Sequence, residues 1–349
     1  MRLRSDRLGS TALAFVAIAL ASCGTLAAPS TGDVDLPASF VGPFLALRAD
    51  QTPTGSGTLV RADVSSAQVD EPSIVRVTSD ARRIAYVTFR ANGMPDAIGR
   101  ATERMDRAPG SLAFEGAAAI FHAEQPWEAG FVRSPDVRAI DATHFVMAYA
   151  AGGGIGIATS SDGMTFTHPS APAIPGDSMD GGNDGPSEPS IARDASGQWF
   201  MVFRRGNSLF VAHASDASGP WTVSPAPILV PTTDAPLDAA AGFDALGLSD
   251  PALSILVTPA GRTLYTLYYT ATGAAPRTVL GAAASYDGMQ WSRVPRAIYS
   301  DRTNSIRAGS LDIVDDRTAL LWIGTGAANA RAVSAVMGPS VGRVSAPGS

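Results

Sequence analysis

The stretch Ser187-Glu188-Pro189-Ser190-Ile191 is one of four versions of the same short phrase in this chain. The other three are Asp70-Glu71-Pro72-Ser73-Ile74, Arg133-Ser134-Pro135-Asp136-Val137 and Ser249-Asp250-Pro251-Ala252-Leu253. Their prolines lie 63, 54 and 62 residues apart, and a weaker fifth version follows at Gly309-Ser310-Leu311-Asp312-Ile313. Self-similarity at such a period is the signature of a repeat architecture.

Each repeat unit has the pattern of four short antiparallel strands. The phrase begins a strand, and a turn then leads to a second strand rich in aromatic and β-branched residues, at 83–89, 143–150, 198–203 and 263–270. A third strand ends in a turn such as Ser160-Ser161-Asp162-Gly163, after which an outer strand begins with an aromatic residue. We therefore expect four-stranded antiparallel sheets.

Four-stranded sheets that repeat around an axis form a β-propeller. The five phrases predict an all-β fold, a five-bladed β-propeller of four-stranded antiparallel blades. The last unit offers only three strands, at 311–314, 319–324 and 332–337, and we expect 44–64 to supply the fourth and close the ring. A two-layer β-sandwich is the alternative, but it does not explain strands grouped in fours at this period.

The N-terminus has the pattern of a bacterial export signal. Arg2, Arg4 and Arg7 precede an apolar stretch at 11–21, too short to span a bilayer, and Leu20-Ala21-Ser22-Cys23 resembles the lipobox of bacterial lipoproteins. The predicted organisation is a signal peptide at 1–22, an acylated Cys23 with a flexible tether at 23–40, one propeller at 41–340 and a tail at 341–349. We expect a monomer, exported and anchored by its lipid in the cell envelope; the alternative is a plain exported protein cleaved nearby.

Charge and composition exclude several classes of function. The formal net charge is −6 and the chain has no basic run, which argues against nucleic-acid binding. Cys23 is the only cysteine, so neither a disulfide framework nor a thiolate metal site is expected. The four histidines lack zinc-ligand spacing. Asp177, Asp180 and Asp184 have oxygen ligands that suit calcium, but they do not match an EF-hand loop, and we predict a solvated acidic loop and no cofactor.

The phrases resemble those of a known superfamily. Ser134-Pro135-Asp136-Val137, the Glu/Asp-Pro strand starts and the stretch Ala214-Ser215-Asp216-Ala217-Ser218-Gly219-Pro220-Trp221 are similar to the five-bladed propeller glycosidases, which include arabinanases, β-xylosidases, invertases and levansucrases. The likeness spans about 42–338. In that superfamily an Asp acts as base or nucleophile, a second Asp tunes the pKa and orients substrate, and a Glu acts as acid.

The resemblance implies roles for individual residues. Asp70 or Glu71 stands at the place of the Asp base, Glu188 at that of the modulating Asp, and Asp250 at that of the Glu acid. The acid types are therefore exchanged relative to the family pattern. We predict Glu188 and Asp250 as the facing catalytic pair, with Glu71 and Asp136 assisting and a carbohydrate as the ligand. Each acid can also be a structural element of its turn.

Other residues are candidates for substrate binding. Arg90 and Arg204 follow the second strands of their units, and Arg307 opens the fifth unit. We therefore predict that these guanidinium groups lie near the propeller axis and, together with Asp70, bind substrate. Trp127 lies in a loop with Glu124 and Glu128 and is a candidate platform for a sugar ring.

Two functions follow from these expectations. The first is a glycoside hydrolase of the cell envelope that cleaves a poly- or oligosaccharide by carboxylate acid/base catalysis. The alternative is a non-catalytic carbohydrate-binding or scaffold lipoprotein that has the propeller without the acid geometry.

Overall fold

A computed structural model describes residues 38–47, 49–53, 55–76, 81–176, 185–232, 242–327 and 330–344. The predicted signal peptide, Cys23, most of the predicted tether and the three aspartates considered for calcium lie outside the described residues. None of the helices in the described part is long and apolar enough to cross a membrane.

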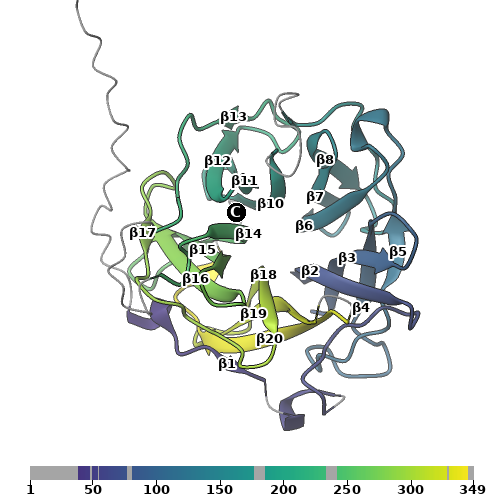
Figure 1. Ribbon diagram of the computed structural model, residues 1–349, viewed down its shortest axis with the longest axis horizontal. Helices are drawn as coiled ribbons and strands as arrows, with labels where there is room; N and C mark the ends of the chain where they lie inside the picture. Colours follow the sequence, from purple (N-terminus) through teal and green to yellow (C-terminus); the bar gives the residue numbers. More distant parts are fainter. Residues whose placement is uncertain are drawn as a thin grey trace, which may run out of the picture. The chain divides into compact units, whose positions relative to one another are not determined.

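The described residues form five antiparallel sheets around a common centre (Figure 1). From the inner strand outward, the first blade is β2 (Ala67–Arg76), β3 (Arg83–Ala91), β4 (Ala97–Thr102) and β5 (Ala118–Phe121). The second blade is β6 (Val132–Asp141), β7 (His144–Ala151), β8 (Gly154–Ser160) and β9 (Ile174–Pro175). The third blade is β10 (Ser187–Arg193), β11 (Trp199–Arg205), β12 (Ser208–Ala214) and β13 (Thr222–Val223). The fourth blade is β14 (Gly247–Val257), β15 (Thr263–Thr272), β16 (Val279–Ser285) and β17 (Ser292–Arg293), and the fifth is β18 (Ser305–Ile313), β19 (Thr318–Gly326), β20 (Ala332–Pro339) and β1 (Leu45–Ala46). The five-bladed β-propeller prediction is confirmed, and the β-sandwich is excluded.

The N-terminal strand closes the ring as predicted. β1 pairs with β20, Leu45 opposite Met337, and Val60 forms a further bridge to Val333. The fifth blade therefore combines three strands from the end of the chain with one from its beginning. This closure covers a sheet edge that would otherwise be open.

The segment predicted as a tail also contributes a strand. β21 (Arg343–Val344) pairs with the inner strand β14 of the fourth blade, which gives that sheet five strands. A side chain at Gly342 would collide with the carbonyl oxygen of Val257, which a Cβ would approach to 2.5 Å. Glycine therefore permits the chain to approach the blade this closely.

The apolar core lies between neighbouring blades. One cluster, for example, joins Val87 and Phe89 of the first blade to Trp322 and Val333 of the fifth. The short helical turns are confined to connections: η1 (Ala38–Val41), η2 (Ala49–Gln51) and η3 (Pro126–Glu128). Blade packing thus fixes the inner strands, each of which contacts its neighbours around the axis.

Candidate active site

A β-bulge interrupts every inner strand at its copy of the repeated phrase. The pairing register shifts between Asp70 and Ser73 in β2, and the four other inner strands shift at the corresponding positions. In four blades the residue before the proline has a positive φ of 45–53°: Glu71, Ser134, Glu188 and Asp250. Non-glycine residues rarely adopt this conformation, which costs about 1–3 kcal/mol at each position.

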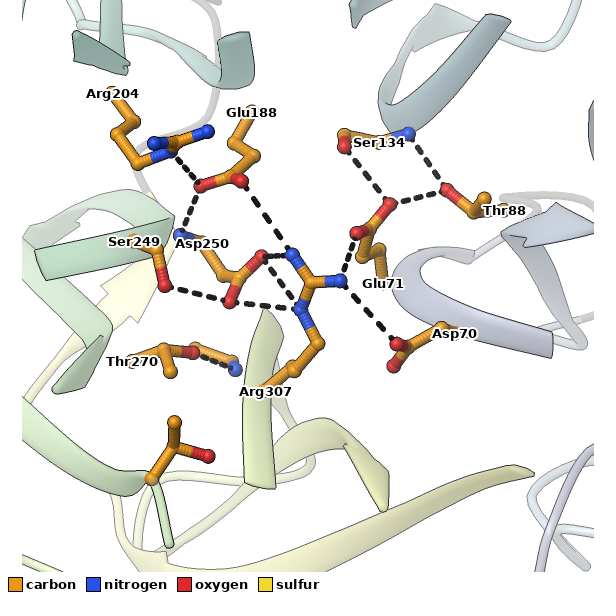
Figure 2. A network of polar contacts seen from close by, with 12 residues as sticks. Asp70, Glu71, Thr88, Ser134, Glu188, Arg204, Ser249, Asp250, Thr270 and Arg307 are labelled. Carbon is orange, nitrogen blue, oxygen red and sulfur yellow. Dashed lines mark hydrogen bonds and ion pairs between the residues drawn. The ribbon is translucent and has the colours of Figure 1, made fainter. Parts of the chain in front are cut away.

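The bulges direct three carboxylates to one point on the axis. Glu71, Glu188 and Asp250 come from the first, third and fourth blades, and their exposed fractions are only 5–7%. The guanidinium of Arg307, from β18, lies between them (Figure 2). The structure therefore brings together three of the four acids predicted as catalytic.

Arg307 contacts all three carboxylates. Its Nη1 is 2.5 Å from Glu71 Oε1, its Nη2 is 2.6 Å from Asp250 Oδ1, and the same Nη2 is 3.5 Å from Glu188 Oε1. Its Nε also donates to both oxygens of Asp250 at 3.1 Å. Glu188 and Asp250 thus share one guanidinium nitrogen, whereas Glu71 is held by the opposite arm.

Asp70 lies next to the ring of three carboxylates, Glu71, Glu188 and Asp250, and is completely buried. Its Oδ2 is 3.0 Å from Arg331 Nη1, 3.5 Å from Arg307 Nη1 and 3.6 Å from Arg90 Nη1. Burial raises the pKa of Asp70, and the neighbouring charge of Glu71 adds to this effect.

The protonation of Glu71 and Glu188 is driven in opposite directions. Although burial works against a charge on Glu71, Arg307 and Arg90 together with the hydroxyl groups of Thr88 and Ser134 hold its pKa well below the usual range. Burial and the charge of Asp250 raise the pKa of Glu188. The pKa of Glu71 is therefore lowered and that of Glu188 raised, so Glu188 keeps a proton to higher pH than Glu71 does, as acid/base catalysis requires.

Two predicted arginines lie at the ring as well. Arg204 Nε donates to Glu188 Oε2 at 3.0 Å, and Arg90 Nη2 lies 3.4 Å from Glu71 Oε1. Arg331, which contacts Asp70, was not predicted from the sequence because it belongs to no repeated phrase. An arginine directly before β20 carries no sequence signal that separates it from a surface residue.

Asp136 takes a different position from the other predicted acids. It stands after its proline, whereas the three ring acids precede theirs, and the place before Pro135 is taken by Ser134. Asp136 Oδ2 accepts hydrogen bonds from Ser190 Oγ at 2.6 Å and from the Ile191 N–H at 2.8 Å. It also pairs with Arg138 at 2.9 Å. The hydrogen bonds to Ser190 and Ile191 join neighbouring blades, whereas the pair with Arg138 lies within β6.

The position of Asp136 belongs to a series of links between blades. The residue after the proline, or its equivalent in the fifth blade, accepts a hydrogen bond from the next inner strand: Ser310 from the Ile74 N–H, Ser73 from the Val137 N–H, Asp136 from the Ile191 N–H and Ser190 from the Leu253 N–H. In the fourth blade this place is occupied by Ala252, which has no side-chain acceptor. We call these four contacts the inter-blade links.

Trp127 packs into the second blade. Its ring lies 5.9 Å from that of Tyr149, and its Nε1 donates to the Pro169 carbonyl oxygen at 3.0 Å. The neighbouring Glu128 is fully buried and accepts hydrogen bonds from the Tyr149 hydroxyl at 2.6 Å and from a His168 ring nitrogen at 2.8 Å. These contacts give Trp127 a role in packing.

One hollow adjoins the acids and another lies nearby. The first, of about 20 Å³, is lined by the bulges of all five inner strands and has room for a single water and not for a sugar. A much larger groove, of about 750 Å³, lies over the fifth blade and has a lining of polar and apolar groups that includes Gln68, Tyr299, Asn304 and Arg331. Arg331 connects this groove to Asp70. Among the described residues, no group of three or more His, Cys, Asp or Glu side chains is arranged to hold a metal ion.

Comparison with solved structures supports the resemblance at the level of the fold. The chain is similar to an endo-arabinase from Bacteroides thetaiotaomicron, with 17% identity, a TM-score of 0.54 and coverage of 81% of this chain and 99% of that one. It is also similar to a thermostable family-43 glycoside hydrolase (15%, TM-score 0.55, 83% and 97%) and to the catalytic domain of a GH62 α-L-arabinofuranosidase from Coprinopsis cinerea (13%, 0.53, 78% and 90%). No protein-family model and no curated protein sequence matches the chain. The protein has the five-bladed propeller fold of these glycosidases.

Proposed function

We propose that this protein is a glycoside hydrolase that cleaves a poly- or oligosaccharide by carboxylate acid/base catalysis. The observation that carries the proposal is the pair of buried glutamates on the two arms of Arg307, where Nη1 lies 2.5 Å from Glu71 and Nη2 lies 3.5 Å from Glu188, so that the negative charge is stabilised more strongly on Glu71. Solved structures with this fold include proteins named as an endo-arabinase, an α-L-arabinofuranosidase and an endo-1,4-β-xylanase, which supports a carbohydrate as substrate.

The proposed reaction assigns one step to each glutamate. Glu188 donates its proton to the glycosidic oxygen as the bond to the anomeric carbon breaks. Glu71 acts from the other side, as base toward a water molecule or as nucleophile, and the positive charge that develops on the sugar is stabilised by the acids around it. Because the hollow at the acids has room for only a single water, this reaction requires the centre to open so that a sugar can reach both glutamates, and the groove beside Arg331 is the place that we propose for the rest of the saccharide.

The test is hydrolysis of aryl glycosides, beginning with arabinofuranosides and xylosides. We expect Glu188→Gln to lower kcat/KM at least 100-fold on substrates with poor leaving groups and much less on activated ones, because only the former need a proton donor. Arg343→Gln, which removes an exposed ion pair with Asp316, is the control and should leave turnover unchanged. Equal turnover by the wild type and Glu188→Gln on every substrate would overturn the proposal.

A second function is favoured by one observation. All three ring carboxylates are already paired with Arg307, and the Asp and Glu types are exchanged relative to the family pattern, as in a propeller that binds a glycan without cleaving it. A glycan array distinguishes the two functions. Binding of a glycan that the wild type never hydrolyses would favour the carbohydrate-binding protein.

We further propose that the protein is an exported, monomeric lipoprotein anchored through Cys23 in the cell envelope. The support is the sequence pattern of Leu20-Ala21-Ser22-Cys23 after a basic and apolar start. In a bacterial host, Cys23→Ala should move the protein from the membrane fraction to a soluble fraction and abolish labelling by a fatty-acid probe. Labelling that persists in Cys23→Ala would rule out this anchor.

A further inference from the structure

Arg307 comes from one of the two blades that have no acid at this bulge position. The fifth phrase has Gly309 and the second has Ser134, where the first, third and fourth blades have Glu71, Glu188 and Asp250. A Cβ on Gly309 would lie 2.5 Å from both Cγ and the carbonyl oxygen of Pro72, so the inner strands approach too closely for a side chain there. Two residues earlier, Arg307 brings a cation into the ring instead.

The contacts of Arg307 are unequal. Asp250 receives Nε and Nη2, and Glu71 receives Nη1 at 2.5 Å. Glu188 has only the edge of the same guanidinium, at 3.5 Å. Since charge stabilisation falls with distance, Arg307 favours a negative charge on Glu71 more than on Glu188.

The remaining partners reinforce this difference. Glu71 Oε2 accepts hydrogen bonds from the hydroxyl groups of Thr88 and Ser134, the latter at 2.9 Å. Glu188 Oε2 accepts from Arg204 and from the Asp250 N–H, whereas for its Oε1 the described residues provide only the 3.5 Å contact to Arg307. Among the carboxylate oxygens of Glu71, Glu188 and Asp250, a proton on Glu188 Oε1 therefore disturbs the fewest hydrogen bonds and ion pairs.

We propose that Arg307 is a positioning residue that assigns the proton of this carboxylate ring to Glu188 and keeps Glu71 ionised. The inference rests on the proposed function, in which these two glutamates act as acid and base. Arg307 itself takes no proton; its fixed charge decides which of the two carboxyl groups carries one. A purely structural arginine would hold the blades together without this selectivity.

The direct test is a titration that requires no catalysis. The chain has six glutamates, so ¹³C labelling of the glutamate carboxyl groups gives few signals, and Glu71→Gln and Glu188→Gln assign the two of interest. In Arg307→Gln the titration midpoint of Glu71 should rise by more than one pH unit, and that of Glu188 should change by less. Arg343→Gln is the control and should move neither.

Two further variants keep the inference falsifiable. Arg307→Lys retains a charge, so it should keep the Glu71 midpoint within one pH unit of the wild type even if Arg307→Gln does not fold. In Arg307→Ala, added guanidinium ion should bring the Glu71 midpoint back toward the wild-type value. If the midpoint of Glu71 does not rise in Arg307→Gln or Arg307→Ala, or rises by the same amount in Arg307→Lys, the inference is wrong.

The activity profile separates this inference from the proposed function. If the protein is a hydrolase, the acidic limb of its kcat/KM profile reports the ionisation of Glu71 and should move to higher pH in Arg307→Gln by the shift seen in the titration. If the titration moves as expected but no glycoside is cleaved by the wild type, the proposed function fails and the assignment of the proton stands.

Discussion

Single residues at the bulges carry both strain and charge. Glu71, Glu188 and Asp250 have positive φ values and are buried, two features that each destabilise a folded protein. A chain selected for stability alone would have glycine or asparagine at such positions. Ser134 has the same conformation without a carboxylate, so the strained bulge belongs to the repeat, and in three of the blades it directs a buried carboxylate toward the axis.

The raised pKa of Glu188 has a consequence for stability. A carboxyl whose pKa is raised by folding stabilises the protein below its ordinary pKa of 4.5, and this contribution is lost as pH rises through the folded value. Glu188→Gln removes the ionisable group, so the variant should be more stable than the wild type at pH 8. The difference should shrink as pH falls toward 4.5.

Thermal unfolding at pH 8 and pH 4.5 checks this expectation. Arg343→Gln provides a reference for the general effect of pH, since its ion pair is exposed. A variant Glu188→Gln that loses stability at pH 8 would show that the charged form of Glu188 is the one the fold favours.

At the scale of strands, the repeated phrase predicted much of the fold. Its period gave the number of blades, and the missing fourth strand of the last unit pointed to the segment that holds β1. Alternation and turn chemistry are local properties, so they can be read along the chain. The pairing of β21 with β14 was not predicted because two residues carry no alternation.

The site was harder to predict than the strands. A residue before proline ordinarily stays extended, and nothing local indicates that Glu71 or Glu188 reverses this at a bulge. Asp136 stands two residues later in its phrase than the other three acids do, but this shift alone does not indicate that its side chain links two blades. The convergence of Arg307 on the acids depends on distances across the ring, which the sequence does not contain.

The segment before β1 should matter more for stability than the strand itself. Phe40 is fully buried and Phe44 nearly so, and each ring lies 5.6 Å from that of Tyr268, whereas Leu45 is 63% exposed. Phe40→Ala should lower the free energy of unfolding by about 3–5 kcal/mol. Leu45→Ala, close to it in the sequence, should change it by less than about 1 kcal/mol.

Chemical denaturation of the two variants measures this difference. Similar losses for Phe40→Ala and Leu45→Ala would mean that closure depends on the strand pairing and not on the buried aromatic rings.

At the scale of the molecule, the inter-blade links hold the ring together. Asp136→Ala leaves the Ile191 N–H, the Ser190 hydroxyl and Arg138 without their partner, and should cost about 3–5 kcal/mol of stability. Asp136→Ser restores the kind of acceptor that Ser73 and Ser190 provide, and should recover part of the loss. Denaturant midpoints of both variants give the comparison, and equal losses would show that the charge of Asp136, and not its place in the series, is what stabilises the ring.

The series has a gap at Ala252, between the fourth and fifth blades, and Arg307 crosses that same boundary to reach Asp250. At this boundary Thr270 Oγ1 accepts a hydrogen bond from the Ala308 N–H at 2.8 Å, and Arg307, the side chain that also organises the charges of the site, adds an ion pair. Any ligand that draws the Arg307 guanidinium away from Asp250 would also loosen the joint beneath it, so hydrogen exchange in β18 would register occupancy of the centre.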